Sequence, residues 1–147
     1  MHRLLGVTVV VILSAALSGC STFLPLWASV APDGTVSISP CIDVEAAHVT
    51  IEYGQFDENW ELQYSDPVEL EFEDVSLAVG EILVLDASTV GDDRHADLMP
   101  ADQWDAMTIT YDDGTFATFD DEDLDDGNWA RDPAEGLFQV QCEAPSE

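Results

Sequence analysis

The sequence predicts an all-β protein, an antiparallel β-sandwich that follows a short apolar segment at the N-terminus. Between residues 35 and 142, most segments alternate apolar and polar side chains with period two, which is typical of strands with one face in a core. Turn-forming residues separate these segments, and Asp113-Gly114 stands between two of them as a hairpin signal. We expect seven or eight short strands.

The expected strands follow this alternation along the chain. They cover residues 35–39 (with a short continuation at 42–44), 48–54, 60–64, 68–73, 82–85, 107–111, 115–119 and 137–142. Residues 82–85 are apolar without a break, which is typical of a strand covered on both faces. Residues 100–107 allow one or two helical turns with Pro100 at the first position, and Asp113-Gly114 suits a type I′ turn.

Short strands with turns between them favour a sandwich of immunoglobulin or fibronectin type. The Cys…Trp…Cys spacing of a true immunoglobulin domain is missing. A small barrel is the alternative architecture.

The N-terminus has the pattern of a secretory signal peptide. A basic start at Arg3 precedes an apolar run over residues 4–17. As a helix this run is about 21 Å long, short of the roughly 30 Å of a bilayer core. A charged start, a short apolar segment and small residues at its end are typical of a cleaved signal.

Leu17-Ser18-Gly19-Cys20 resembles the lipobox of bacterial lipoproteins at all four positions. The resemblance implies a diacylglyceryl group on the Cys20 sulfur, cleavage after Gly19, and a protein held on the extracytoplasmic side of the cell membrane, since two acyl chains anchor stably. An ordinary signal peptide with a chance cysteine and an uncleaved anchor are the alternatives. The expected organisation is a lipoprotein signal peptide at 1–19, a lipidated tether at 20–32, an acidic sandwich domain at 33–143 and a tail at 144–147.

The large excess of acidic residues excludes some classes of binding partner. All 31 acidic residues follow Cys20, where only Arg94 and Arg131 oppose them, and the chain has no lysine. A nucleic-acid partner is excluded because phosphate binding needs clustered cations, and direct docking on anionic lipid is disfavoured for the same reason. We expect a monomer, with a protein or glycan partner that the sequence does not identify.

Once lipid occupies Cys20, two cysteines remain. In an oxidising compartment Cys41 and Cys142 are expected to form one disulfide that ties the two ends of the domain together. Two inert buried thiols are the alternative.

The acidic run Asp120–Asp126 is a candidate metal site. Asp121, Asp123 and Asp125 have the alternate spacing of a calcium loop. Gly127 stands one place late, however, and Asp132 occupies the twelfth position, where a bidentate Glu is expected, so the run fails as an EF-hand. A solvated acidic loop is the alternative.

Two further groups of residues are candidates for chemistry. His95, among the acidic residues 92–97, lacks the additional ligands that a catalytic zinc site needs, and Arg94 offsets local negative charge. Four aromatic residues offer a platform for a sugar ring or a peptide: Trp60, Tyr64, Trp104 and Trp129. We expect Trp60 and Tyr64 to pack in the core, and Trp104 and Trp129 to be the more exposed pair.

The sequence therefore favours a membrane-anchored surface lipoprotein with a binding or structural role, no catalytic residues and no obligate cofactor. A calcium-assisted binding module that uses the loop at 120–126 is the alternative.

Overall fold

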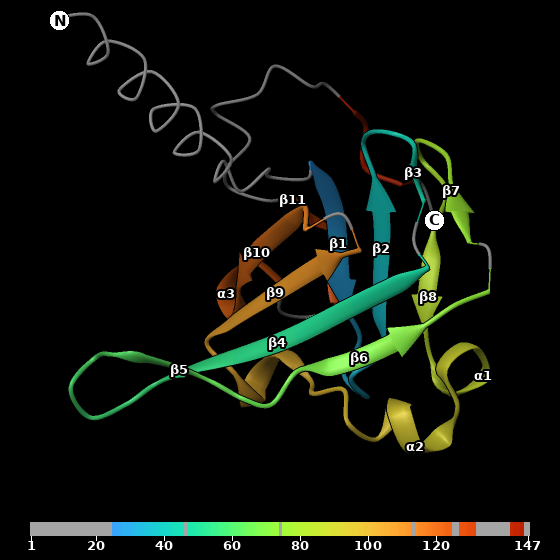
Figure 1. Ribbon diagram of the computed structural model, residues 1–147. Coiled ribbons are helices and arrows are strands. Elements are labelled where there is room, and N and C mark those ends of the chain that lie inside the picture. The colour runs from blue at the N-terminus through green and yellow to red at the C-terminus, as the bar shows by residue number, and fades with distance from the viewer. Residues whose placement is uncertain are drawn as a thin grey trace, which may run out of the picture.

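The computed structural model describes residues 25–45, 47–73, 75–112, 114–124, 127–131 and 142–145. Within them the chain is an all-β sandwich, as predicted, in which two antiparallel sheets pack on one hydrophobic core (Figure 1).

The first sheet has the order β11-β1-β2-β8. β1 (Leu26–Val30) and β2 (Val36–Pro40) pair along their whole length, β8 (Leu83–Leu85) extends β2, and β11 (Ala130–Arg131) extends β1. In β1 every second residue is buried, so one face of the sheet lies in the core.

The second sheet has the order β10-β9-β4-β5. Its long central strand, β4 (His48–Phe56), pairs with β9 (Ala106–Tyr111) on one side and with both β5 (Leu62–Tyr64) and β6 (Val68–Glu71) on the other. β10 (Phe116–Asp120) pairs with β9 and forms the edge.

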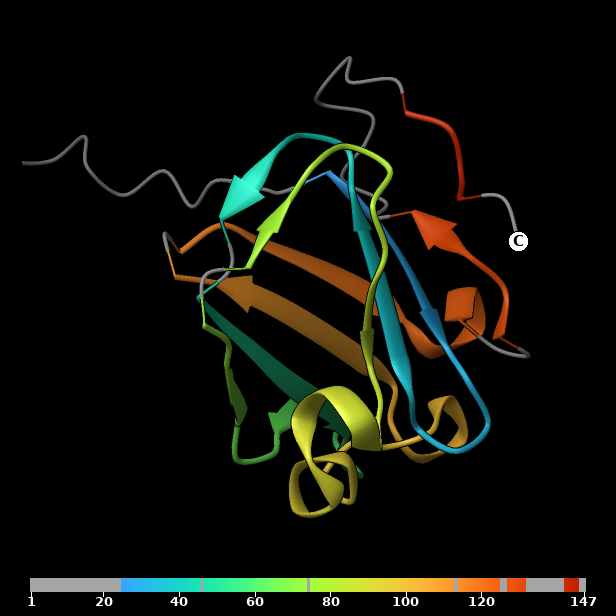
Figure 2. The same cartoon turned by 90° about the vertical axis from the view of Figure 1, so that its right-hand side faces the viewer.

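Short elements close the two ends of the sandwich. The two-stranded sheet β3–β7 lies at one end and the helices α1 and α2 lie at the other (Figure 2). These and the remaining short elements are β3 (Val44–Glu45), β7 (Ser76–Leu77), α1 (Ala87–Val90), α2 (Asp92–His95), η1 (Ala101–Gln103) and α3 (Asp121–Leu124).

The order of the strands is that of the immunoglobulin and fibronectin sandwiches. β1, β2 and β8 make one sheet, to which β11 is added beside β1, and β4 pairs with the β9–β10 hairpin in the other. The core between the sheets includes Leu26, Ile38, Leu85, Ile51, Tyr53, Ile109 and Phe119.

Three expectations about the fold need correction. The sandwich begins at β1, inside the segment 20–32 expected to be a tether, because Leu26, Ala28 and Val30 are buried. The described residues form eleven strands, more than the seven or eight predicted, and several of these have only two residues. β8 is not covered on both faces, since Ile82 beside it is 44% exposed. The strand expected at 137–142 lies outside the described residues, apart from Cys142.

The turn between β9 and β10 also differs from the prediction. Tyr111 N–H donates to the carbonyl of Thr115, and Gly114 N–H donates to the carbonyl of Tyr111, both at 2.9 Å. The loop therefore has three residues, with Gly114 at a φ of 78°, and is not a two-residue type I′ turn. Such a loop needs a positive φ at its third residue, which is why glycine is favoured there.

Candidate functional site

The hairpin of β4 and β5 projects beyond the body of the sandwich (Figure 1). Asp105 fastens its base to the sheet: its backbone N–H donates to the carbonyl of Gly54 at 2.9 Å, and its carboxylate accepts the N–H of Phe56 at 2.6 Å. The side-chain amide of Gln55 donates to the carbonyl of Gln103 in η1. These three contacts fix the direction in which the hairpin leaves the protein.

Asp57 closes the tip of this hairpin. Its carboxylate accepts the backbone N–H of Asn59 at 2.8 Å and of Glu61 at 3.0 Å. Hydrogen bonds from the backbone N–H groups of Glu61, which has the larger effect, and of Asn59 lower the pKa of Asp57 below its ordinary value. The carboxylate therefore stays ionised, and keeps the loop closed, in mildly acidic solution.

The turn at the tip has the same two backbone hydrogen bonds as the turn between β9 and β10, but its third loop residue is tryptophan instead of glycine. Asp57 N–H donates to the carbonyl of Glu61, and Trp60 N–H donates to the carbonyl of Asp57, both at 3.0 Å. The β1–β2 turn has the same two bonds, from Ala31 to Thr35 and from Gly34 to Ala31. The third residue of the loop has a positive φ in all three turns, at Gly34 (87°), Gly114 (78°) and Trp60 (64°).

Among the residues that the structure describes, Trp60 is the one non-glycine residue with a positive φ. A bulky side chain in this region of backbone space is unusual and costs conformational energy. Its indole gains little burial in return, because the side chain is 82% exposed. Local folding energetics therefore do not explain a tryptophan at this position.

Two more exposed aromatic side chains lie on the same hairpin: Phe56 next to Trp60, and Tyr64 nearer the base, opposite Gly54. Phe56 is 48% exposed and Tyr64 is 54% exposed. The rings of Phe56 and Trp60 have centroids 6.1 Å apart and planes inclined by 48°. The rings of Phe56 and Trp60 are tilted rather than coplanar, so they do not form a flat platform. We refer to the three exposed aromatic residues of the hairpin (Phe56, Trp60 and Tyr64) as the aromatic tip.

The loop of the tip is negatively charged. Glu58 and Glu61 are exposed on either side of Trp60, next to the ionised Asp57. The two arginines of the described residues lie elsewhere: Arg94 on α2 faces Asp97 at 3.8 Å, and Arg131 on β11 lies over the ring of Trp27.

The hairpin leaves the sandwich at the end opposite to the one where the described chain begins. Cys41 N–H donates to the carbonyl of Pro25 at 2.9 Å, which places the start of β1 beside the end of β2. At the other end of β1, Thr35 contacts His95 of α2 at 3.0 Å. The hairpin base joins that second end, since Met99 N–H donates to the hydroxyl of Tyr53 at 3.2 Å.

The structure reverses the predicted burial of the aromatic residues. Trp60 and Tyr64 are exposed, whereas Trp104 is 3% exposed. The indole N–H of Trp104 donates to the carbonyl of Met99 at 3.1 Å, and its ring packs on Tyr53. Burial raises the pKa of Tyr53 to about 12. Trp129 is half-buried, so the four residues do not form one platform.

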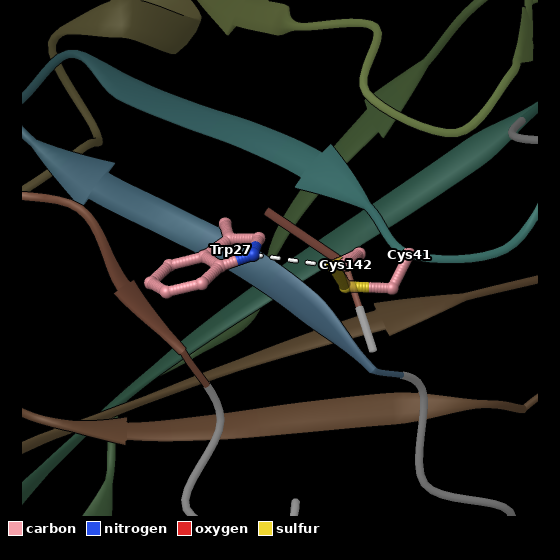
Figure 3. Close-up of a disulfide and its surroundings, with 3 residues drawn as sticks. All are labelled: Trp27, Cys41 and Cys142. Carbon is pink, nitrogen blue, oxygen red and sulfur yellow. Dashed lines mark hydrogen bonds between the residues drawn. A yellow bond between two sulfur atoms is a disulfide. The ribbon is translucent and has the colours of Figure 1, made fainter. Parts of the chain in front are cut away.

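Cys41 and Cys142 lie at the distance that a disulfide requires (Figure 3). Their Cα atoms are 5.4 Å apart and the structure joins their sulfurs. The indole N–H of Trp27 on β1 donates to the sulfur of Cys142 at 3.2 Å. Cys20, the predicted lipidation site, lies outside the described residues.

The structure describes only part of the acidic run that was the candidate calcium loop. Residues 121–124 form the helical turn α3, in which Asp121 and Asp123 stand two positions apart and so do not face each other. Asp125 lies outside the described residues. No group of three or more possible metal ligands occurs in the part of the chain that the structure describes.

The two histidines of the described residues contact different parts of the fold. His95 lies at the end of α2 and contacts the hydroxyl of Thr35. His48 at the start of β4 contacts the carboxylates of Glu71 and Asp112, each at 3.2 Å. The hydrogen bond that His48 donates to the Glu71 carboxylate (the larger effect) and the charge of Asp112 raise the pKa of His48 above its ordinary value.

Comparison with family models, curated proteins and solved structures finds no match for the chain. None of the helices among the described residues is long and apolar enough to cross a bilayer.

Proposed function

We propose that this chain is a membrane-anchored lipoprotein whose β-sandwich is a binding module, with the aromatic tip of the β4–β5 hairpin as its contact surface. The observation that carries the proposal is the position of Trp60. Its backbone occupies the left-handed region at a φ of 64°, where the two equivalent turns have glycine, while 82% of its side chain is exposed.

Strained backbone at an exposed position is characteristic of functional sites, because nothing in folding selects it. Tryptophan and tyrosine are also the residues most enriched among energetic hot spots of protein interfaces. Here the rings project on a hairpin whose base and tip are held by Asp105 and Asp57. A contact surface ordered in advance loses less conformational entropy when it binds.

The proposed anchor agrees with this orientation. Cys20, the proposed site of lipid attachment, precedes Pro25 by five residues. Pro25 lies at the end of the sandwich opposite to the hairpin base. The aromatic tip then faces away from the anchoring membrane, towards partners in the extracytoplasmic space. The same geometry disfavours a role in which the three rings insert into that membrane.

The role that we propose is not catalytic. The two histidines of the described residues contact different elements, and each is occupied by its neighbours. This separation supports binding over acid–base chemistry, which needs its groups in one site.

Site-specific photocrosslinking in living cells tests the proposal. A photoreactive phenylalanine analogue replaces Trp60 in the full chain, and in a second strain it replaces Val79, which is also exposed but follows β7 at the other end of the sandwich. We expect a discrete adduct from position 60 alone, which Tyr64→Ser in the same chain abolishes. Equal adducts from both positions, or no adduct from position 60, would contradict the proposal.

A further inference from the structure

We infer that the partner of the aromatic tip is a protein segment that carries arginine or lysine side chains. This inference rests on the proposed function and adds the chemistry of the ligand. It follows from the charges beside Trp60, a separate observation from the exposure of the rings.

Two carboxylates at the tip are available to a partner. Glu58 and Glu61 are exposed, and they flank Trp60 in the loop. Asp57 is engaged in closing the loop, so its charge adds to the local negative potential without offering a free ligand. Neither arginine of the described residues lies at the tip, so this potential is not neutralised there.

The ring of Trp60 also favours an arginine or lysine side chain. Tryptophan is the best aromatic partner for a cation placed over its face, and arginine is the more frequent cation. A guanidinium above the exposed indole can also donate hydrogen bonds to a neighbouring carboxylate, because its donors lie at the rim of its plane. The tip therefore offers one side chain both a face to stack on and a carboxylate to pair with.

Other occupants are less compatible with these charges. A nucleic acid or an anionic headgroup meets carboxylates at the tip, where neither described arginine lies. A second copy of this chain brings the same excess of acidic residues, which repel one another on approach. A neutral sugar ring can stack on Trp60 but carries no charge to pair with Glu58 or Glu61.

A titration with short peptides tests the inference on the full chain, purified from expressing cells in a neutral detergent. The probe is the blocked peptide acetyl-Gly-Arg-Gly-Arg-Gly-amide, and its comparison peptide has citrulline, which is neutral and of similar shape, in place of both arginines. The readout is the NMR shift of the Trp60 indole N–H, assigned by its loss in Trp60→Phe. We expect saturable binding of the arginine peptide and at least about fivefold weaker binding of the citrulline peptide, which corresponds to about 1 kcal/mol.

Matched variants separate local from general attraction. Glu58→Gln with Glu61→Gln should weaken the arginine peptide about fivefold, as two exposed ion pairs allow. Glu69→Gln with Glu73→Gln, on and beside β6, changes the net charge equally and should alter binding by less than about twofold. Equal effects of the two double variants, equal binding of both peptides, or no shift of Trp60 with either peptide would overturn the inference. The photocrosslink at position 60 does not depend on peptide charge, so the proposed function stands or fails separately.

Discussion

Trp60 occupies the place in the β4–β5 turn that Gly114 occupies in the turn between β9 and β10. In both turns this residue donates its N–H to the carbonyl three positions earlier, and in both its φ is positive, at 64° and 78°. Glycine adopts this conformation without steric cost, whereas a residue with a Cβ pays about 1–2 kcal/mol. The two turns therefore allow the cost of placing tryptophan at the tip to be measured.

Replacing Trp60 with glycine should not destabilise the protein. The substitution removes the backbone strain and loses only an exposed side chain and its contact with Phe56. We expect the free energy of unfolding, measured by urea titration, to stay the same or rise by up to about 1 kcal/mol. A loss greater than about 1 kcal/mol would mean that Trp60 is retained for stability, contrary to our account.

The reverse substitution in the matched turn is the control. A Cβ on Gly114 meets no atom within 4 Å, so Gly114→Ala changes only the backbone preference. We expect a loss of about 1 kcal/mol in the same urea titration. If Gly114→Ala costs nothing, the argument from backbone strain at Trp60 loses its basis.

The Cys41–Cys142 disulfide should contribute much of the stability of the sandwich. It joins residues 101 positions apart, and a loop of about 100 residues corresponds to roughly 4.7 kcal/mol in the chain-entropy model. Unfolding of the Cys41→Ala, Cys142→Ala double variant should therefore be easier by about 4 kcal/mol. A reductant should destabilise the native chain and leave the double variant unchanged; a native chain indifferent to reductant would refute the bridge.

The stability of the fold should depend on pH through His48. The pKa of His48 is raised in the fold by Glu71 and Asp112, so the imidazolium is favoured there. The resulting stabilisation is complete below the unfolded pKa of about 6.5 and is lost as the pH rises through the higher folded pKa. NMR titration should show the midpoint of His48 falling in Glu71→Gln and unchanged in Glu69→Gln. A His48 midpoint that is unchanged in Glu71→Gln would contradict the role of Glu71 in raising this pKa.

Period two was a sufficient guide to the central strands. β4, β9 and β10 lie within one or two residues of the predicted ranges and bury mainly alternate residues, because a sheet face in contact with a core tolerates little polar substitution. Residues 26–30 (Leu-Trp-Ala-Ser-Val) do not alternate apolar and polar side chains, so their sequence does not predict β1, although their burial alternates in the structure. Trp27 breaks the pattern on the outer face, where Arg131 lies over its ring.

The site was less predictable because it breaks the pattern on which the prediction depended. Trp60 shares the phase of Leu62 and Tyr64 in sequence, but its positive φ lies in a turn and interrupts the strand. Trp104 follows a 3₁₀ turn, where no period applies, and its burial depends on contacts with Tyr53 and Met99. One signal was available in the sequence: Asp57 followed two positions later by Asn59 is typical of a turn.

Lipid attachment at Cys20 remains a prediction from the lipobox. Cys20→Ala should abolish metabolic fatty-acid labelling and leave the protein unprocessed or shed from cells, because only a thiol accepts the diacylglyceryl group. Labelling and the mature N-terminus are read by autoradiography and mass spectrometry. Undiminished labelling of the variant, or a mature N-terminus other than Cys20, would exclude the anchor.

The central claim is that the sandwich holds an exposed Trp60 in a fixed position, ready for contact. Backbone ¹⁵N relaxation of Trp60 tests this most directly, with Asp57→Ala as the comparison because Asp57 closes the loop. We predict an order parameter near the value of about 0.85 that is typical of rigid backbone, and below about 0.6 in Asp57→Ala. A Trp60 as mobile in the native protein as in the variant would contradict the account.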